Sequence, residues 1–417
     1  MSSLARKSFT VFLLAFLNFL NATDRYIVAG LLAQIAPFYT ISDSTAGLLQ
    51  TVYILVYVVV APLFGYLGDS GMGDAVINTL APSLMGDMFS VRGRGFSLMI
   101  YYYALPFGWS ASTIVSSQIV QANVDWKWGL RVVPPISAVV IILLALVLLE
   151  PRRQGTTAES TKSTVFDDVK HIMTIKSFLL MLVAIASVNI VTSAQGWWNP
   201  TILQLAMKST HDDPVIYHGM QYAVIQSIIG IQNTVGGILG GTIAVFIAEW
   251  WSSRGIVCLG PAARAASIVG GIGTLLASPS TLFVQHLYKI DIVWYFVTAF
   301  WGSIMCFGTV VPTDRRATAT AIYSIFGSLL GDAPSPYIIG AIADDFRDHS
   351  VPDQDGDHMN SLLRAFYISN SFMVLCSLAL LLSSLFVVKD ERVFNETEEE
   401  NETLSQQESY AHIESVD

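Results

Sequence analysis

The feature that most constrains this chain is a series of long apolar segments. The first runs from Phe9 to Leu32, and at ~1.5 Å of rise per residue it forms a helix of about 36 Å, which is long enough to cross a bilayer. Soluble domains carry about 25% charged residues, whereas only 13% of this chain is charged and 53% is hydrophobic. The sequence therefore predicts an all-α polytopic membrane protein. The apolar segments fall at about 9–32, 46–68, 95–120, 130–149, 177–206, 219–250, 255–277, 291–311, 317–342 and 362–388, with a shorter, ambiguous piece at 70–89.

Basic residues predict how these segments are oriented, because cytosolic loops are enriched in Lys and Arg. Arg6, Arg92, Arg152 and Arg254 flank segments that place all four in the cytosol if the N-terminus is inside. This orientation predicts two helical lobes and a cytosolic linker between them. The boundaries are 1–150 for the first lobe, 151–176 for the linker and 177–388 for the second lobe.

A parity argument singles out the piece at 70–89. Arg6 and Arg92 lie on the same side only if an even number of spans separates them, and the segments 9–32 and 46–68 already make two. The piece at 70–89 should therefore not cross fully, or a partner span is missing. This predicts 10–11 transmembrane segments.

The acidic excess of the chain is confined to its end. The formal net charge is −10, and residues 389–417 hold ten acids and two bases. Composition predicts that this tail is cytosolic and disordered, and it argues against nucleic acid as a partner. The sequence contains no His/Cys metal cluster, phosphate-binding loop or Ser-His-Asp set that would indicate a cofactor or an enzyme.

Asp24 and Arg25 lie inside the first apolar segment, in the stretch NATDRYIVAG. An isolated charge at the bilayer centre costs at least ~2.5 kcal/mol, so such a residue is expected to face a polar cavity or a partner. Arg25 is long enough to snorkel to the interface, whereas Asp24 is too short. Asp24 is therefore the stronger functional candidate. The alternative is that Asp24 and Arg25 pair with each other in a purely structural role.

Two other patterns concern helix packing and membrane anchoring. GGILGG, at residues 236–241, contains overlapping G-x-x-x-G spacings that predict close helix packing rather than nucleotide binding. Trp197, Trp198, Trp250 and Trp251 are expected to be anchors at the membrane interface, with Trp197 alternatively lining a lipid path.

Three stretches of the chain resemble the Spinster family of major facilitator lipid transporters. NATDRYIVAG matches the family's first helix, and GLLQTVYILVYVVVAPLFGYLGD, at 47–69, matches its second. The longest match is VPTDRRATATAIYSIFGSLLGDAPSPYIIGAIAD, at 311–344. The resemblance implies a major facilitator fold, whose two halves rock around a site near the middle of the membrane.

The departures from the family pattern begin after Asp69. There the family continues with a basic loop, a third helix and a fourth-helix arginine, but this chain runs into SGMGDAVINTLAPSLMGDMF. That stretch resembles the second half of the family's fourth helix, with Asp74 in place of a Glu. The third helix and the arginine are therefore expected to be missing, which would account for the parity problem.

The resemblance also implies roles for the site residues. Asp24 would carry a proton, and Arg25 would hold an anionic lipid headgroup through bidentate hydrogen bonds to its phosphate. The alternative is that Arg25 has a structural role and pairs with Asp24 or Asp74. Asp74 is expected to belong to the same binding site if its helix has the position of the family's fourth helix.

Other residues are expected to act in gating or structure. Gly65 and Asp69 are remnants of the facilitator gating loop, with a plain helix-end carboxylate as the alternative for Asp69. Asp332, in GDAPSP, is expected to be a satisfied carboxylate at a proline bend rather than a ligand. Arg315 and Arg316 are expected to be cytosolic anchors.

The predicted function is proton-coupled transport of a single-chain lipid by alternating access. The lipid would be a lysophospholipid or a sphingolipid such as sphingosine-1-phosphate. The alternative is a transport-incompetent truncated isoform or a non-transporting membrane protein, motivated by the missing helix. The YAHI pattern at 410–413 weakly favours binding of a sorting adaptor. A lysosomal or late endosomal membrane is therefore expected, with the plasma membrane as the alternative.

Overall fold

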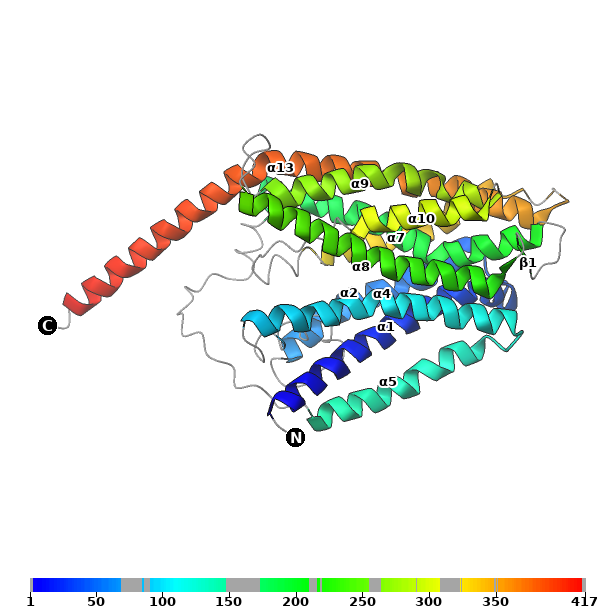
Figure 1. The fold of residues 1–417 in the computed structure, drawn as a ribbon, viewed down its shortest axis with the longest axis horizontal. Helices are drawn as coiled ribbons and strands as arrows, with labels where there is room; N and C mark the ends of the chain where they lie inside the picture. Colours follow the sequence, from blue (N-terminus) through cyan, green and yellow to red (C-terminus); the bar gives the residue numbers. More distant parts are fainter. Residues whose placement is uncertain are drawn as a thin grey trace.

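The computed structural model is a bundle of long helices (Figure 1). It describes residues 3–68, 85, 91–147, 173–209, 216–217, 220–254, 264–289, 291–307, 323, 325–348, 350 and 352–414. The helices are α1 (Ser3–Tyr39), α2 (Asp43–Gly68), α4 (Val91–Gln121), α5 (Lys127–Val147), α7 (Lys176–Ser209), α8 (Tyr222–Arg254), α9 (Ala265–Phe283), η2 (Val284–Lys289), α10 (Ile292–Phe307), the π-helical turn η3 (Ser328–Asp332), α12 (Pro334–Phe346) and α13 (Gln354–Glu414). Two-residue strands β1 (Ile216–Tyr217) and β2 (Met220–Gln221) pair antiparallel before α8.

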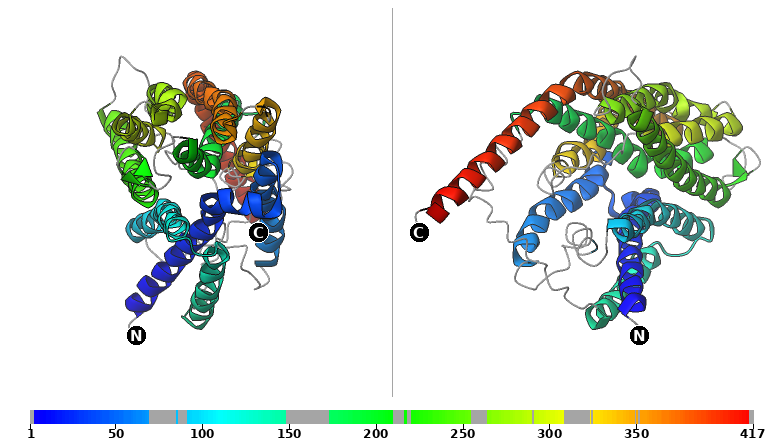
Figure 2. Two further views of the ribbon diagram at one scale, coloured as in Figure 1. Left: turned by 90° about the vertical axis from the view of Figure 1, so that its right-hand side faces the viewer. Right: turned by 60° about the vertical axis from the view of Figure 1, so that its left-hand side comes forward.

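The described helices pack in two groups. α1 packs against α4 and α5, whereas α13 packs against α7 and α9, and α10 packs against α8 and α9. The groups meet where α2 contacts α12, where α4 contacts α8 and where α1 contacts α7. Figure 2 shows the same arrangement from two further sides. By the boundaries expected from the sequence, α1, α2, α4 and α5 fall in the first lobe and α7 to α13 in the second, and α2 packs mainly against α12 across this boundary.

Six helices in the described part of the chain are long and apolar enough to cross a membrane. Helices suit this role because a bilayer core offers no water, so every backbone N–H and C=O must be satisfied within the segment. α2 and α4 also coincide with predicted spans, at 46–68 and 95–120. The six spans are in α1, α5, α7, α8, α9 and the first part of α13.

The helix directions agree with the parity argument. α2 ends and α4 begins at the end of the bundle where the N-terminus lies (Figure 1). The predicted linker between α5 and α7 connects helices at this same end. Residues 69–84, which include Asp69, Asp74 and most of the ambiguous piece, lie outside the described residues.

The packing role predicted for GGILGG is confirmed where α8 meets α10. A Cβ atom added to Gly240 would collide with the carbonyl oxygen of Ile304, and one added to Gly236 would lie 2.7 Å from Cβ of Ser303. Both approaches are closer than real Cβ atoms allow, so these backbones lie close together because the residues are glycines.

Three of the four tryptophans differ from their expected position. Trp197 and Trp198 are 2% and 1% exposed, and the indole N–H of Trp198 donates to the Pro336 carbonyl at 3.1 Å. The prediction of interface anchors is therefore wrong for both, because α7 lies against helices of both lobes and buries these rings. Trp251 is buried as well, whereas Trp250 is 43% exposed, as an anchor would be.

The acidic tail also differs from its expected form. α13 continues as one helix to Glu414 and leaves the bundle as a rod, whereas composition predicted disorder from Lys389 onward (Figures 1 and 2). Glu is the most frequent residue of this segment, and its strong helix propensity opposes the disordering effect of the charge.

The end of the bundle that is opposite the N-terminus is held together by polar contacts between lobes. The Asp344 carboxylate accepts from the backbone N–H groups of Asp43 and Ser44, at 3.1 and 2.8 Å, and so caps α2 from α12. His358 Nε2 lies 2.6 Å from Oδ2 of Asp43. A Cβ added to Gly47 would collide with the backbone of α12, so the two helices are in backbone contact.

Replacing Asp344 should loosen this end. Loss of a helix cap costs about 1 kcal/mol, so Asp344→Ala should shift the ratio of closed to open molecules about fivefold toward open. Spin labels at positions 45 and 346, in a background without the native cysteines, would show a larger population of long distances. Asp345→Ala is the matched control, because Asp345 is exposed beside Asp344. Equal distance distributions for both variants would contradict this role for Asp344.

Candidate substrate and proton site

Arg25 points from α1 toward α2 and the second lobe. The amide of buried Gln50 is assigned with its oxygen toward Arg25, because this orientation gives both groups matching partners. That oxygen then accepts from Nε of Arg25 at 2.8 Å and from Nη2 at 2.9 Å. Two donors on one neutral acceptor fix the guanidinium while leaving its positive charge uncompensated by Gln50.

Among the described residues, Asp332 on η3 is an acidic group close enough to feel the charge of Arg25. The charge of Arg25 acts on the Asp332 carboxylate, and the charges of both residues act on the Tyr26 hydroxyl. Ser328, one turn earlier, donates to Oδ2 of Asp332 at 3.4 Å. Since α1 and α2 belong to the first lobe and η3 to the second, this pair joins the two lobes.

The backbone around Asp332 is irregular, as the proline in GDAPSP predicted. η3 is a π-helical turn, and Pro334 starts α12 directly after it. Such turns are frequent at functional sites because they leave backbone groups outside the regular ladder. The Asp332 carbonyl accepts from Ser193 of α7 at 3.1 Å, and Thr51 of α2 donates to the Ala333 carbonyl. Asp332 is therefore held where three helices meet, and it was expected to be structural only.

Asp24 lies on a different side of α1 from Arg25. Its side chain is half-buried, and among the described residues it has no hydrogen-bond or ion-pair partner. Asn21, one turn earlier, is exposed and accepts from the Tyr53 hydroxyl of α2 at 3.4 Å. The alternative in which Asp24 and Arg25 satisfy each other is not what the structure shows, because Arg25 is engaged by Gln50 and Asp332.

Two stacked aromatic rings extend the site into the bundle. The Arg25 guanidinium lies 5.2 Å from the ring centroid of Tyr26, which is within the range of cation–π attraction. Tyr26 stacks on Trp109 of α4, with centroids 5.1 Å apart and planes 16° apart. Gly196 of α7 lies against both rings. The rings therefore connect the charged residues with the region beyond Trp109.

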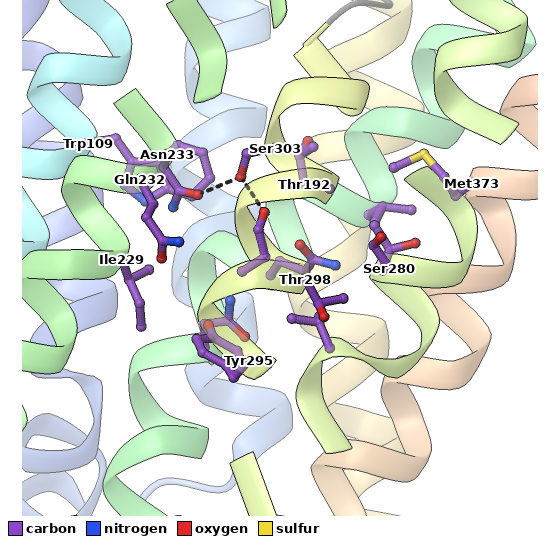
Figure 3. A pocket seen from close by; sticks show the side chains of 17 residues that line it. Trp109, Thr192, Ile229, Gln232, Asn233, Ser280, Tyr295, Thr298, Ser303 and Met373 are labelled. Atoms are coloured by element: carbon purple, nitrogen blue, oxygen red, sulfur yellow. Dashed lines mark hydrogen bonds between the residues drawn. The ribbon is translucent and has the colours of Figure 1, made fainter. Parts of the chain in front are cut away.

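Beyond Trp109 lies a pocket of about 80 Å³ (Figure 3). Most of its lining is apolar, and we call it the polar pocket because uncharged hydroxyl and amide groups supply its hydrogen-bonding surface. Its walls come from α7, α8, α9 with η2, α10 and α13 of the second lobe, and Trp109 is the residue from the first lobe. Among the described residues that line it, none has a charged side chain. Hydroxyl and amide groups dominate its polar surface, including those of Gln232, Asn233 and Ser303.

The structure places only part of the predicted site. Arg25 and Asp332 come together, Asp24 faces away from them, and Gly65 lies near the end of α2. Asp69, Asp74, Arg315 and Arg316 lie outside the described residues. No group of three or more potential metal-ligating side chains occurs in the described part of the chain.

Sequence reasoning missed three contributors. Gln50 carried a usable signal, because it is a polar amide inside the apolar stretch GLLQTVYILVY. Tyr26 and Trp109 carried none, because aromatic residues are common in membrane helices and only the fold stacks these two.

The chain was compared with known proteins. The family profile of the Major Facilitator Superfamily matches residues 70–336, and this match begins directly after Asp69. The chain is 28% identical to protein spinster homolog 3 of Danio rerio, over 93% of this chain and 86% of the relative. It is 29% identical to the sphingosine-1-phosphate transporter SPNS2 of Xenopus tropicalis, over 93% of this chain and 82% of the relative.

The alignment lengths bear on the missing segment. The alignment with the Danio rerio protein spans 446 positions, although this chain has only 417 residues. The relative therefore has residues inside the matched region that have no counterpart here. The loss of a segment after Asp69 stays a prediction, because the alignment length does not give the position of these residues.

The fold was also compared with solved structures. A crystal structure of a bacterial homolog to the human lysosomal transporter Spinster, in the inward-facing and unoccupied conformation, superposes with a TM-score of 0.67 at 16% identity. It covers 92% of this chain and 98% of the bacterial chain. A crystal structure of a D-xylose-proton symporter superposes with a TM-score of 0.58 at 12% identity, covering 88% of this chain and 97% of the symporter. With its two lobes, its inter-lobe charges and these matches, the chain belongs to the Major Facilitator Superfamily, a family of transporters and not of enzymes, and within it resembles the Spinster proteins.

Proposed function

We propose that the protein transports a single-chain lipid, either a lysophospholipid or a sphingolipid such as sphingosine-1-phosphate, by proton-coupled alternating access. The observation that carries the proposal is the position of Arg25, an inter-lobe cation with a neutral hydrogen-bond partner on α2 and an acidic group on η3. The similarity to a sphingosine-1-phosphate transporter supports a lipid with an anionic head.

Arg25 is suited to hold a phosphate. Gln50 orients its guanidinium fork without neutralising it, and a phosphate oxygen can replace the Gln50 oxygen as bidentate acceptor. When the phosphate binds, Arg25 is drawn away from Asp332, which weakens an attraction between the lobes. Substrate binding thus changes the balance between states, as alternating access requires.

Asp24 is suited to carry a proton. A carboxylate without a hydrogen-bond or ion-pair partner is stable as an anion while water hydrates it, and it takes up a proton when it is moved into surroundings without water. Its position one residue before Arg25 on α1 means that movements of this helix change the surroundings of both residues together. Coupling between proton and lipid then follows from one moving helix.

The location of the protein in the cell is part of the proposal. We place it in the lysosomal or late endosomal membrane, with the plasma membrane as the alternative. A sorting adaptor that reads residues 410–413 stays a weak proposal, supported by the sequence pattern alone. Fluorescence microscopy of the full chain against a lysosomal marker tests the location, and the Tyr410→Ala variant tests the adaptor.

A second function has one observation in its favour. The relatives have internal residues that this chain lacks, and a first lobe short of a helix would be unable to rock as a unit. The chain would then be a transport-incompetent isoform or a non-transporting membrane protein. Lipid flux in proteoliposomes of the purified full chain separates the two functions, since only the transporter moves lipid across the membrane.

Neutralising Asp24 should remove the pH dependence of transport. Asp24→Asn keeps the size of the side chain but cannot take up a proton, so lipid flux driven by a pH gradient should fall to the rate without a gradient. The measurement is uptake into proteoliposomes at several internal pH values. Asp125→Asn, an exposed carboxylate in a loop, is the control and should behave as wild type. Full pH-dependent flux in Asp24→Asn would refute the proton-carrier role.

Shortening the fork of Arg25 should weaken phosphate binding specifically. Arg25→Lys keeps the charge but loses bidentate geometry, and a lost hydrogen bond to a charged group costs ~1.5–3 kcal/mol. Affinity for a phosphate-bearing lipid should fall about 10- to 100-fold, measured as quenching of a fluorescent lipid in nanodiscs. The control is Arg131→Lys, because Arg131 is exposed on α5. An unchanged affinity in Arg25→Lys would mean that Arg25 is structural.

A further inference from the structure

We propose that the polar pocket binds the free hydroxyl that single-chain lipids carry beside their phosphate, and that this contact selects them over two-chain lipids. The inference rests on the proposed lipid transport and adds what the site recognises. Sphingosine-1-phosphate and lysophosphatidic acid share this hydroxyl, whereas in two-chain phospholipids the corresponding oxygen is esterified to a second acyl chain.

Gln232 lines the pocket and has a buried acceptor that the protein leaves unused. Gln232 Nε2 donates to the Phe296 carbonyl at 2.7 Å, which fixes the orientation of the amide. Its Oε1 atom is buried and has no hydrogen-bond partner among the residues that the structure describes. Because an unpaired buried acceptor costs about 1–3 kcal/mol, a ligand that donates to Gln232 recovers this energy.

A donor lies beside this acceptor. The Ser303 hydroxyl lies 3.0 Å from Asn233 Oδ1 and 2.9 Å from the Ala299 carbonyl of its own helix, and its single proton is shared between these two acceptors (Figure 3). The Asn233 NH₂ group has no acceptor among the described residues. An acceptor and a donor in one small pocket match a hydroxyl group, which both donates and accepts.

The absence of charge in the pocket narrows the choice of ligand. No charged side chain is found among the described residues that line it, so a phosphate placed there would be desolvated without a counter-ion. A neutral hydroxyl loses less solvation energy and finds both of its partners. The phosphate and the hydroxyl therefore belong to different ends of the site.

The order of contacts along the site supports such a division. Arg25 contacts Tyr26, Tyr26 stacks on Trp109, and Trp109 is part of the pocket wall. The rings therefore lie between the cation and the pocket, and the carbons that join phosphate and hydroxyl would pass along them. Once a phosphate draws Arg25 away from Asp332, the long guanidinium side chain can move toward the pocket and shorten the span that the lipid head must bridge.

The size of the pocket adds to the selectivity. A volume of about 80 Å³ holds a hydroxyl and its carbon, whereas a long acyl chain on the same oxygen would have to leave through the open side of the pocket. Esterification also removes the hydroxyl proton, which leaves the Gln232 oxygen unpaired again. Both effects act against two-chain lipids.

The test compares two probes that differ only at this oxygen. They are 1-oleoyl-lysophosphatidic acid and its 2-O-methyl counterpart, and binding of each to the full chain in nanodiscs is measured by competition with a fluorescent lipid. Wild type should prefer the hydroxyl probe about five- to tenfold, as expected for the loss of one hydrogen bond. Gln232→Leu should bind both probes equally, with less than about a twofold change for the methyl probe, because it removes the acceptor that only the hydroxyl uses.

The control keeps the same substitution in the same helix. Gln226 of α8 is buried against Tyr222 and does not line the pocket, so Gln226→Leu should keep the wild-type preference. If Gln232→Leu loses helical content by circular dichroism, Ser303→Ala serves instead. This substitution removes the hydroxyl beside Asn233 with a smaller change in side-chain volume. It should reduce the preference for the hydroxyl probe about two- to threefold, because the Gln232 acceptor itself is kept.

The outcomes separate this inference from the proposed function. If wild type binds both probes equally, or if Gln232→Leu keeps the preference, the pocket does not read the hydroxyl, although lipid binding stands. If wild type binds neither probe while the protein is folded, the proposed function fails and the inference fails with it.

Discussion

The structure depends on how one guanidinium is accommodated inside an apolar bundle. Arg25 cannot be left unpaired at this depth, because a desolvated cation costs several kcal/mol. The fold satisfies it with Gln50 from the neighbouring helix and with the charge of Asp332 from the other lobe. The lobes are therefore held together at the site by a contact that an anionic ligand can replace.

Away from this site, the lobes are held together by different means. At the Asp344 end, the contacts are a helix cap, a His–Asp pair and backbone packing at Gly47. The first two are polar contacts between groups near the water interface, whereas the Arg25 contact lies within the bundle. An interface of glycines and hydrogen bonds buries little apolar area. Separating its two helices therefore costs less free energy than opening a core of large side chains. This arrangement suits two lobes that must part and rejoin.

The sequence predicted the helical spans, the two lobes and the odd parity near Asp69, because hydropathy and loop charges are fixed by the membrane itself. It also predicted that Arg25 needs a partner. It did not predict that Gln50 and Asp332 would act on Arg25, because Asp24, Asp74 and Asp332 are all acidic and the packing of η3 against α2 brings in Asp332. Trp197 was misplaced for the same reason, since tryptophan suits both the interface and a core, and the choice depends on how many helices surround α7.

The segment expected to be missing after Asp69 would affect Arg25 and Asp24 differently. Two groups that act on Arg25, Gln50 on α2 and Asp332 on η3, belong to helices that this chain retains. Asp24 has no partner in the described part of the chain, and it shares its side of α1 with exposed Asn21. In the family pattern, an acidic fourth helix and its arginine would complete the proton end. Under the proposed function, a chain shortened in this way would keep the contact of Arg25 with the lipid head, while its coupling to protons would depend on Asp74 and its neighbours. Asp24 and Arg25 both lie on α1, so binding and coupling would differ in the partners that each residue needs and not in the helix that carries it.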